Sequence, residues 1–372
     1  MSHRSTSVEA TWRKFSPLAK SAGITRVADV TGLDTLGIPV FTAIRPMGRS
    51  LSTSQGKGIT AGHARVSALM ESLETWTAEN LALPTVRSSA KKLGKRAVDV
   101  RELARPKGKL DRDATWRWVE GRELVTDTSI LVPEQAVTLD TTFTKPPVFD
   151  ISSNGLASGN TINEAVVHAL CEVLERDAEA AWRRSGSDHR IVLDSIADPV
   201  CRDLIGRITA TGARVFLWNL DGVIPVCGCA IMEDPHEPAW RTLGMYQGFG
   251  AHVRPEYAIA RAITEAAQTR LTYIVGARDD FFPFDYERST DPELLADIWD
   301  RLAAPCDEPA LFEDLGGVET ASLAEDFDAL MNITVASGAE QIIAVDLTHP
   351  QLRVPVVKVV VPGAAVDVEA MG

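Results

Sequence analysis

Acidic side chains recur at helical spacing in three separate stretches of the chain, and this pattern is the strongest sign of chemistry in the sequence. In the first stretch, Ser67, Glu71 and Glu74 fall on one face of a helix, at about 100° per residue. The opposite face is apolar and includes Leu69 and Leu73. A hydroxyl and two carboxylates one turn apart could bind a cation, although a single helix with this pattern is more typical of a polar face in contact with water.

The second stretch carries a longer acidic face. Thr161 and Glu164 form a capping box, which predicts that a helix begins here. Its polar residues within one quarter of the helical circumference are Glu164, His168, Glu172, Glu175 and Glu179. Like charges one turn apart destabilise a helix, so this arrangement indicates that cations neutralise them. Carboxylate oxygens suit Mg²⁺, which is usually bound together with phosphates. The pattern predicts a magnesium–phosphate site, with an acidic surface as an equally weighted alternative.

The third stretch is a helix predicted to begin at Pro255, because proline is suited to the first helical position. Glu265 and Gln268 share one face of this helix. Arg270 points elsewhere and would reach a ligand only by its length. By itself, this third pattern does not indicate a site.

Two glycine-rich polar segments precede the first two helices and are interpreted as loops. Residues 54–58 (SQGKG) precede the first helix, and residues 153–161 (SNGLASGNT) lead into the second. Backbone N–H groups at such a junction bind anions. Neither segment has the glycine spacing of a Walker A loop or of a dinucleotide-binding fingerprint.

Taken in order, these stretches resemble the YcaO family of ATP-dependent peptide-modifying enzymes. Ser67, Glu71 and Glu74 match its Ser-x3-Glu-x2-Glu-Arg motif, with Thr75 in place of the arginine. The second motif, Ser-x6-Glu-x3-Gln followed by Glu-x2-Glu-Arg, is matched by Ala157, Glu164, His168, Glu172, Glu175 and Arg176, so that alanine replaces serine and histidine replaces glutamine. The third motif is matched by Glu265, Gln268 and Arg270, and the resemblance spans residues 37–363.

The resemblance implies a mixed α+β fold of the YcaO type, in which two intimately packed halves have sheets covered by long helices and the nucleotide site lies between them. We expect residues 1–372 to form a single YcaO-like domain. The implied cofactors are ATP and Mg²⁺. The implied Mg²⁺ ligands are Glu71, Glu74, Glu164, Glu172 and Glu175. The implied ATP contacts are Ser67, Arg176, Gln268, Arg270, His168 and Lys57, and Arg45, Arg65 or Lys57 could replace the missing arginine.

The family's shared chemistry is activation of a peptide backbone amide. A nucleophile adds to the carbonyl, ATP phosphorylates the amide oxygen, and phosphate then leaves. Sulfide as the nucleophile yields a thioamide, a Cys, Ser or Thr side chain yields an azoline, and an amine yields an amidine. The resemblance does not identify the catalytic residues, which stay unknown.

Thioamidation of a peptide or protein with a TfuA-type partner is the favoured activity. This expectation rests on the lack of a recognisable leader-binding module at the N-terminus and of a proline-rich tail at the C-terminus, both seen in azoline-forming relatives. An azoline-forming cyclodehydratase, with a leader-binding partner, and macroamidine formation are the alternatives. A non-catalytic YcaO-like binding subunit is a further one, because Thr75, Ala157 and His168 depart from the motifs. Whether the chain forms a homodimer stays open.

The elements that must position these residues are long helices and short apolar strands. The spacing predicts helices over residues 61–80, 161–184 and 255–276. Runs rich in Val, Ile and Leu predict strands at RVFLWNL, PVCGCAIM, QIIAVDL and VPVVKVVVP. Cys227 and Cys229 lie in the second of these runs, where we expect them to pack in the core and not to act as thiolates.

Composition and charge limit the class of protein. The chain has 372 residues, of which 45% are hydrophobic and 24% charged, as in globular proteins. Its net charge of -13 argues against a general nucleic-acid binder. No apolar run approaches the roughly 18 residues that a membrane span needs, and the N-terminus lacks a signal-peptide core. With an odd number of cysteines, five, these features favour the reducing cytoplasm.

Overall fold

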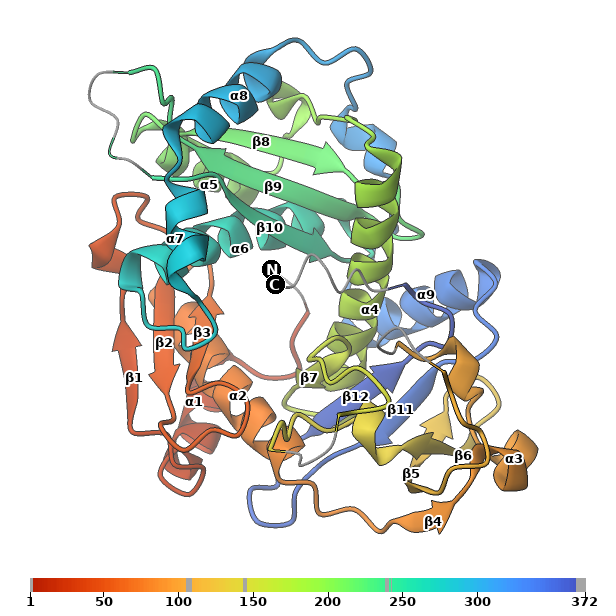
Figure 1. Ribbon diagram of the computed structural model, residues 1–372. Helices are drawn as coiled ribbons and strands as arrows, with labels where there is room; N and C mark the ends of the chain where they lie inside the picture. The colour runs from red at the N-terminus through yellow and green to blue at the C-terminus, as the bar shows by residue number, and fades with distance from the viewer. Residues whose placement is uncertain (1–2, 105–108, 143–145, 238–240, 242, 366–372) are drawn as a thin grey trace.

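The computed structural model describes residues 3–104, 109–142, 146–237, 241 and 243–365 (Figure 1). Its α-helices are α1 (Val8–Phe15), α2 (Ala61–Glu79), α3 (Ala90–Leu93), α4 (Ile162–Ser185), α5 (Pro199–Thr209), α6 (Pro255–Val275), α7 (Pro283–Ser289), α8 (Pro292–Ala303) and α9 (Leu323–Ala336). Its strands are β1 (Arg26–Asp29), β2 (Val40–Ile44), β3 (Thr53–Lys57), β4 (Val86–Ser88), β5 (Trp116–Glu123), β6 (Thr128–Pro133), β7 (Leu156–Ser158), β8 (Arg214–Asn219), β9 (Val226–Met232), β10 (Tyr246–Ala251), β11 (Ile343–Asp346) and β12 (Val356–Val360).

The three predicted long helices, α2, α4 and α6, are confirmed to within two residues at each end. Helix α2 begins after Thr60, whose side chain accepts from a backbone N–H in the first turn, and α6 has its proline at the first position. Helices α4 and α6 end at Gly186 and Gly276, which adopt left-handed φ values of 68° and 59°. Glycine adopts this conformation without the steric cost that other residues bear, so both ends are set locally.

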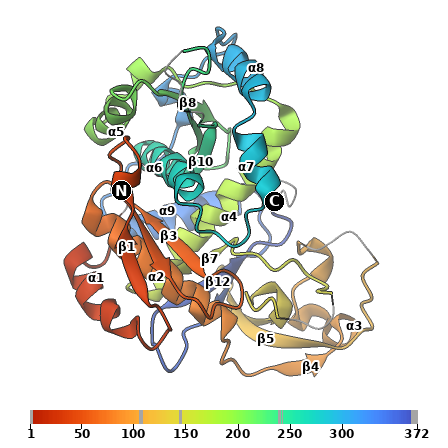
Figure 2. The ribbon, with the colours of Figure 1, turned by 60° about the vertical axis from the view of Figure 1, so that its left-hand side comes forward.

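The strands within the described ranges form three antiparallel sheets (Figures 1 and 2). One has the order β1-β2-β3, a second β10-β9-β8, and the largest β4-β5-β11-β12-β7, with β6 paired to β5. Helix α2 packs on β3 and β2, and α6 packs on β10 and β9. Helix α4 contacts β12 and β7 as well as β10, so it joins the largest sheet to the β8–β10 sheet. The predicted mixed α+β class and the four predicted strands are confirmed.

The glycine-rich segments are partly strands, which corrects the prediction of two loops. Residues 53–57 form β3, in which Gly56 pairs with Phe41 of β2. A Cβ atom on Gly56 would lie 2.0 Å from the backbone nitrogen of Ala68 in α2. Glycine is therefore required here because helix and strand approach closely, and not because the segment wraps around an anion. In the second segment, residues 156–158 form β7, which pairs with β12.

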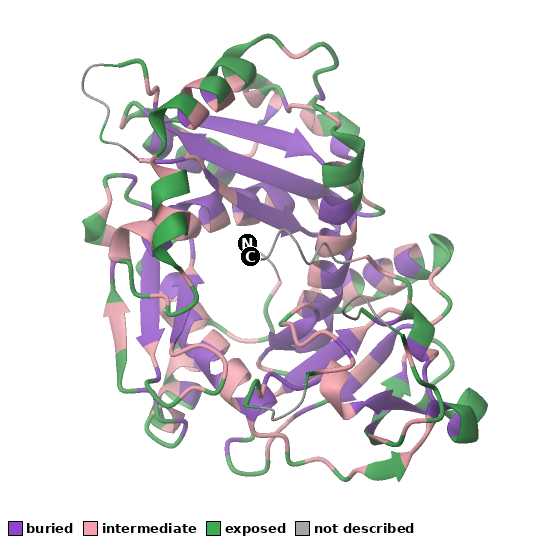
Figure 3. Cartoon of the chain, in the orientation of Figure 1, coloured by how far each residue is buried: buried purple, intermediate pink, exposed green. Residues whose placement is uncertain are grey.

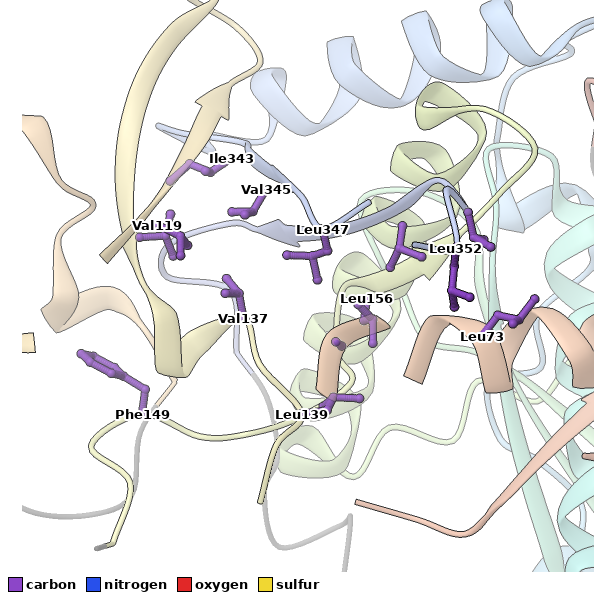
Figure 4. Packing of buried hydrophobic residues seen from close by; sticks show 14 of the residues in the cluster. Leu73, Val119, Val137, Leu139, Phe149, Leu156, Ile343, Val345, Leu347 and Leu352 are labelled. Atoms are coloured by element: carbon purple, nitrogen blue, oxygen red, sulfur yellow. The ribbon is translucent and has the colours of Figure 1, made fainter. Parts of the chain in front are cut away.

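Buried residues are concentrated on the strands and on the helices that pack against them (Figure 3), and most of them are apolar. One cluster joins α2 to the largest sheet, with Leu73, Val119 and Val345 among its members (Figure 4). Cys227 and Cys229 are buried in β9, and burial raises the pKa of both thiols, as expected for cysteines that pack and do not react. Among the helices of the described ranges, none combines the length and apolar composition that a membrane crossing requires.

Candidate functional site

Helix α2 presents two partly buried carboxylates on its polar face. Glu71 accepts a hydrogen bond from the backbone N–H of Gln55 in β3, at 3.2 Å. Burial raises the pKa of Glu71 to about 7. Burial, and then the neighbouring charge of Glu71, raises the pKa of Glu74 well above its usual value, although hydrogen bonds from Ser158 oppose the shift. Burial and a neighbouring negative charge both favour the protonated, neutral form of these carboxyl groups. A nearby cation would favour the ionised form instead.

Helix α4 adds two more carboxylates, of which Glu172 lies near enough to raise the pKa of Glu74 on α2. Burial raises the pKa of Glu172 to about 7, with Arg176 and Lys358 acting in the opposite direction. Burial raises the pKa of Glu175 to about 7 as well, and the charge of Glu265 adds to this effect. The acidic face of α4 is therefore enclosed by other elements, which favours the predicted site over the acidic-surface alternative.

Helix α6 contributes Glu265, which forms an ion pair with Lys57 of β3. Burial alone would raise the pKa of Glu265, but Lys57 and Arg176 hold it below its usual value. Its second carboxylate oxygen accepts from the backbone N–H of Phe249, at 3.3 Å. Lys57 thus comes to the carboxylate cluster, which we define as Glu71, Glu74, Glu172, Glu175 and Glu265.

Lys358 borders the same cluster and was missed by the sequence reasoning. It lies in the middle of β12, is 5% exposed, and donates to the carbonyl oxygen of Ser152 at 2.6 Å. Burial lowers the pKa of Lys358 to about 8, and the charges of Glu172 and Glu74 oppose this shift. The available signal was a lysine inside the apolar run VPVVKVVVP, because a buried charge is rare without partners.

Arg176 reaches the cluster from α4 and is held in place by a further acid. Its Nη1 atom lies 2.7 Å from Glu179, which also accepts from Arg183 at 2.7 Å. The pKa values of Glu172, Glu175 and Glu265 all respond to its charge. Glu179 therefore orients an arginine and is not itself exposed to a ligand.

Glu164 is not brought together with the other predicted metal ligands. Its carboxylate accepts from Arg4 at 3.0 Å and from the Ser5 hydroxyl at 2.7 Å. The Thr161 hydroxyl accepts from its backbone N–H at 3.2 Å, so half of the predicted capping box forms, while the carboxylate turns to the N-terminal segment. Glu164 also lies eight residues before Glu172, or about 12 Å along a helix axis. We therefore leave it out of the cluster.

His168 and Arg261 lie between Glu164 and the cluster. The Nδ1 atom of His168 is 2.6 Å from Nη2 of Arg261. The Nη1 atom of the same arginine donates to the carbonyl oxygen of Ala251 at 2.7 Å. Burial, followed by the charge of Arg261, lowers the pKa of His168 well below its usual value, so the ring is neutral. Both residues line a small hollow together with Glu164. Arg261 is a candidate contact that the sequence reasoning did not identify.

Arg270 lies away from the cluster. It is fully buried, with Nε 2.8 Å from Asp34 and Nη2 2.7 Å from Glu233. A guanidinium committed to two carboxylates ties α6 to neighbouring segments, so we assign it no nucleotide contact. Gln268, two residues earlier, instead donates to the backbone carbonyl of Gln55 at 3.3 Å. Gln268 therefore lies beside β3, whose Gln55 backbone N–H also donates to the carboxylate of Glu71.

Ser67, the last of the predicted ATP contacts, lies near Glu71, together with two further residues. Ser67 is partly exposed, one turn before Glu71 on α2. Thr75, which stands where the motif has arginine, donates to the carbonyl oxygen of Glu71 at 2.8 Å. Arg278 lies near enough to lower the pKa of Glu71, against the larger effect of burial.

The three residues suggested as substitutes for the missing arginine make different contacts. Arg45 is bound to Glu79, with atoms 2.5 Å apart, and Arg65 stacks 4.0 Å from the ring centre of Trp12. Lys57 alone of these three reaches the cluster, through Glu265. Lys57 and Arg278 are therefore the two cations whose charges reach Glu71, one turn before Thr75.

The donor set fits a metal ion that is bound through phosphates. In the described part of the chain, no three His, Cys, Asp or Glu side chains are already gathered closely enough to hold a metal ion by themselves. Mg²⁺ does not need such a cage, because it usually takes one or two carboxylates and completes its shell with phosphate oxygens and water. The buried carboxylates of α2 and α4, with their raised pKa values, meet that requirement.

Comparison with known proteins points to one family. A family model described as YcaO cyclodehydratase, ATP- and Mg²⁺-binding, matches residues 55–365. A protein of Rhizobium leguminosarum bv. trifolii, described as an uncharacterized protein in the tfuA 3′ region, is 37% identical over 98% of this chain and 89% of its own length. A protein of Methanothermobacter thermautotrophicus is 32% identical over 97% of this chain and 96% of its own.

Two solved structures share the fold. The YcaO protein from Methanopyrus kandleri, bound with AMPPCP and Mg²⁺, superposes with a TM-score of 0.77 and 27% identity over 97% of this chain and 92% of that one. A heterocyclase in complex with substrate and cofactor gives a TM-score of 0.82 at 22% identity, a likeness of fold alone. It covers 97% of this chain, which spans only 53% of that longer protein.

Proposed function

The chain belongs to the YcaO family, whose members are described as ATP- and Mg²⁺-binding cyclodehydratases, and from this premise we propose that it activates a peptide backbone amide by ATP-dependent phosphorylation of the amide oxygen. One observation carries the proposal. Carboxylates from three helices, α2, α4 and α6, meet in a buried cluster whose pKa values are shifted by one another and by a few cations. Such a group is costly to the fold unless a ligand uses it.

The residues of the cluster divide into two roles. Glu71, Glu74, Glu172 and Glu175 would hold Mg²⁺, since their pKa values are raised and bound protons would be displaced by a metal. When bound, ATP with Mg²⁺ supplies a phosphoryl group that turns the amide oxygen into a leaving group.

The cations around the cluster would hold the nucleotide. Arg176 and Arg261 have planar guanidinium groups, which donate two parallel hydrogen bonds to a phosphate. Glu265 positions Lys57 through their ion pair, and Gln268 and Ser67 lie close by on α6 and α2. His168, being neutral and bonded to Arg261, would fix the orientation of that arginine.

Within this chemistry we propose thioamide formation, with sulfide as the nucleophile and a TfuA-type protein as partner. The support is the Rhizobium relative, which is 37% identical over nearly the whole chain and is described by its place in the tfuA region. The substrate would be a peptide or a protein. We propose that the reaction takes place in the cytoplasm, where the cysteines, all free in the structure, would stay reduced.

Cyclodehydration to an azoline is the second candidate, because the matching family model is described as a cyclodehydratase. A Cys, Ser or Thr side chain of the substrate would then take the place of sulfide. A leader-binding protein would replace the TfuA-type partner. The same carboxylate cluster would serve both reactions, since the activation step is shared.

The test is a reconstitution followed by mass spectrometry of the peptide. The protein is mixed with a cognate peptide, ATP, Mg²⁺ and sulfide, with and without the TfuA-type protein. A mass gain equal to exchange of oxygen for sulfur, dependent on both proteins, is the expected result. Loss of one water without any need for sulfide would assign cyclodehydration instead. ATP binding with no change of peptide mass under any combination would favour a non-catalytic subunit.

A further inference from the structure

The corner of the molecule formed by α3, β4 and β5 concentrates positive charge (Figures 1 and 2). Residues 86–104 and 109–117 hold nine lysines and arginines against four acids, whereas the whole chain holds 38 against 51. We define the basic patch as the exposed cations on or beside these elements: Arg87, Lys91, Lys92, Lys95, Arg96, Arg112 and Arg117. On a protein that is acidic as a whole, such a surface is suited to an anionic partner.

The patch contains two like charges directly opposite each other. Arg87 of β4 pairs with Arg117 of β5 in the antiparallel register, so both side chains leave the sheet on the same face. Their Cβ atoms are then about 5 Å apart, and like charges placed this way destabilise a sheet. Nε of Arg117 lies 2.8 Å from Glu134, whereas Arg87 has no ion-pair partner among the described residues. An anion lying across β4 and β5 would relieve this repulsion.

The rest of the patch comes from α3 and the segments next to it. The backbone N–H of Lys91 donates to the carbonyl oxygen of Arg112 at 3.1 Å, so α3 lies beside residues 111–113. The exposed surfaces of α3 and β4 are visible in Figure 3. Three further cations form no ion pair within the described ranges: Lys92, Lys95 and Arg96. Charges that only keep an edge strand from pairing with other chains lie on the strand, but most of this patch lies outside β4 and β5.

Strand β4 also offers a free edge. It stands at the end of the largest sheet, and among the described strands it pairs only with β5. Its other edge can therefore pair with an extended polypeptide through backbone N–H and C=O groups. A nucleic acid would not use such an edge, and its charges would extend beyond the patch onto a protein whose remaining charge is negative. An acidic, extended polypeptide fits both features.

The place of β4 in the sheet favours the substrate as the source of that polypeptide. The sheet order is β4-β5-β11-β12-β7, and Lys358 of β12 borders the carboxylate cluster. Three strand spacings of about 4.8 Å separate β4 from β12, or about 14 Å along the sheet. A chain extended at about 3.3 Å per residue covers that distance with about five residues. One polypeptide can therefore contact the patch and reach the cluster at the same time.

We propose that the basic patch binds an acidic, extended segment of the substrate polypeptide, at least about five residues from the amide that reacts at the carboxylate cluster. The inference rests on the proposed function, because it concerns the substrate of that reaction. It adds a contact remote from the nucleotide-binding motifs, which holds the substrate by its charge and not by the residue that is modified.

The first test measures binding of an acidic peptide to the full chain without nucleotide, by isothermal titration calorimetry. The probe is a blocked peptide of alternating glutamate and threonine, and a lysine–threonine peptide has the opposite charge. Arg87→Glu and Lys95→Glu reverse charges inside the patch. Arg202→Glu, at an exposed position of α5, is the matched control, because it makes the same change in net charge elsewhere. Arg87→Glu should also raise the melting temperature, since it places opposite charges across β4 and β5.

The wild type and Arg202→Glu should bind the acidic peptide equally, and each patch variant should bind it about fivefold more weakly. Raising the salt concentration from about 0.05 M to about 0.5 M should weaken binding to the wild type. The proposal would be overturned if the wild type did not bind the peptide, if it bound the lysine peptide equally well, or if Arg202→Glu were weakened as much. Tighter binding of a single-stranded DNA of equal charge would overturn it in favour of a nucleic acid.

The second test concerns the source of the acidic segment. In the reconstituted reaction, Arg87→Glu should raise KM for the substrate polypeptide about fivefold and leave kcat unchanged, because the patch holds the substrate away from the reacting amide. An unchanged KM in a variant that has lost the acidic peptide would assign the patch to another protein and overturn the substrate assignment. Mg²⁺–ATP affinity should be equal in all variants. A wild type that binds the acidic peptide but not Mg²⁺–ATP would contradict the proposed function and leave the peptide result standing.

Discussion

At the scale of single residues, the carboxylate cluster is a store of unfavourable electrostatic energy. Glu71, Glu172 and Glu175 have pKa values near 7, mainly because they are buried. Near neutral pH these groups therefore either stay protonated in the folded state, or ionise and lower the free energy of unfolding. A cation that binds only the folded state removes this cost, which links ligand binding to stability.

Replacing one of these acids should reveal that link. We expect Glu172→Gln to abolish Mg²⁺-dependent ATP binding, because the amide cannot offer a charged ligand. In the absence of metal at about pH 8, the same change should stabilise the fold by about 1–2 kcal/mol, since a carboxylate with a raised pKa no longer has to ionise. Calorimetry and thermal unfolding measure the two effects. Glu164→Gln is the control: it lies outside the cluster and should keep Mg²⁺-dependent binding.

The pH dependence of stability follows from the same groups. A carboxylate whose pKa is about 7 when folded, against 4.5 as the ordinary value, stabilises the fold at low pH and loses that contribution as pH rises through about 7. The metal-free protein should therefore melt at a lower temperature at about pH 8 than at about pH 6. Mg²⁺ with ATP should raise the melting temperature more at the higher pH. An equal increase at both pH values would show that the metal does not compete with these protons.

At the scale of elements, close packing of helices on strands sets where the carboxylates lie. A Cβ atom on Gly250 of β10 would lie 2.2 Å from the carbonyl oxygen of Ala258 in α6. Gly56 of β3 plays the same role against α2. Because Glu265 and Glu71 project from these two helices, the small residues on the strands determine how near the acids can come to Lys57.

Gly250→Ala should therefore displace α6. We expect a loss of about 2–3 kcal/mol in the free energy of unfolding, the usual cost of an overpacked contact, together with weaker ATP binding because Glu265 moves with its helix. Chemical denaturation and calorimetry are the measurements. Gly206→Ala is the control: it lies on α5 with no atom within 4 Å of its added Cβ, and should stabilise the protein slightly. Equal changes in unfolding free energy and ATP affinity in the two variants would contradict the idea that packing at Gly250 positions α6.

At the scale of the whole molecule, β12 connects the two largest apolar clusters. Val356 belongs to the cluster that joins α2 to the largest sheet, whereas Val357 and Val359 belong to the cluster around α4 and the β8–β10 sheet. Successive side chains of a strand point to opposite faces, so a single strand contributes to both. We propose on this basis that the chain unfolds as one unit.

Denaturation by guanidinium chloride should then show one transition, with tryptophan fluorescence and far-UV circular dichroism coinciding. Val357→Ala should shift that whole transition by about 2 kcal/mol. Two separated transitions, or a shift confined to one probe, would divide the chain into independent units. A variant of an exposed position such as Val125 serves as the control and should leave the transition unchanged.

The sequence by itself determined the three long helices, the Thr161 cap, four of the apolar strands and the family. These depend on neighbours within a few residues, such as the Thr161 cap and the glycines that end α4 and α6. Helical periodicity also placed Glu71 and Glu74 on one face of α2.

Only the tertiary structure decided which faces meet. It placed Lys358 beside the cluster, paired Glu164 with the N-terminal segment, and committed Arg270 to Asp34 and Glu233. Periodicity states which side chains share a face of one element, but the partners of that face come from segments 37 to 236 residues away in these examples. Packing of α2, α4 and α6 on the three sheets, and not any local pattern, therefore determined which of the predicted acids form one site.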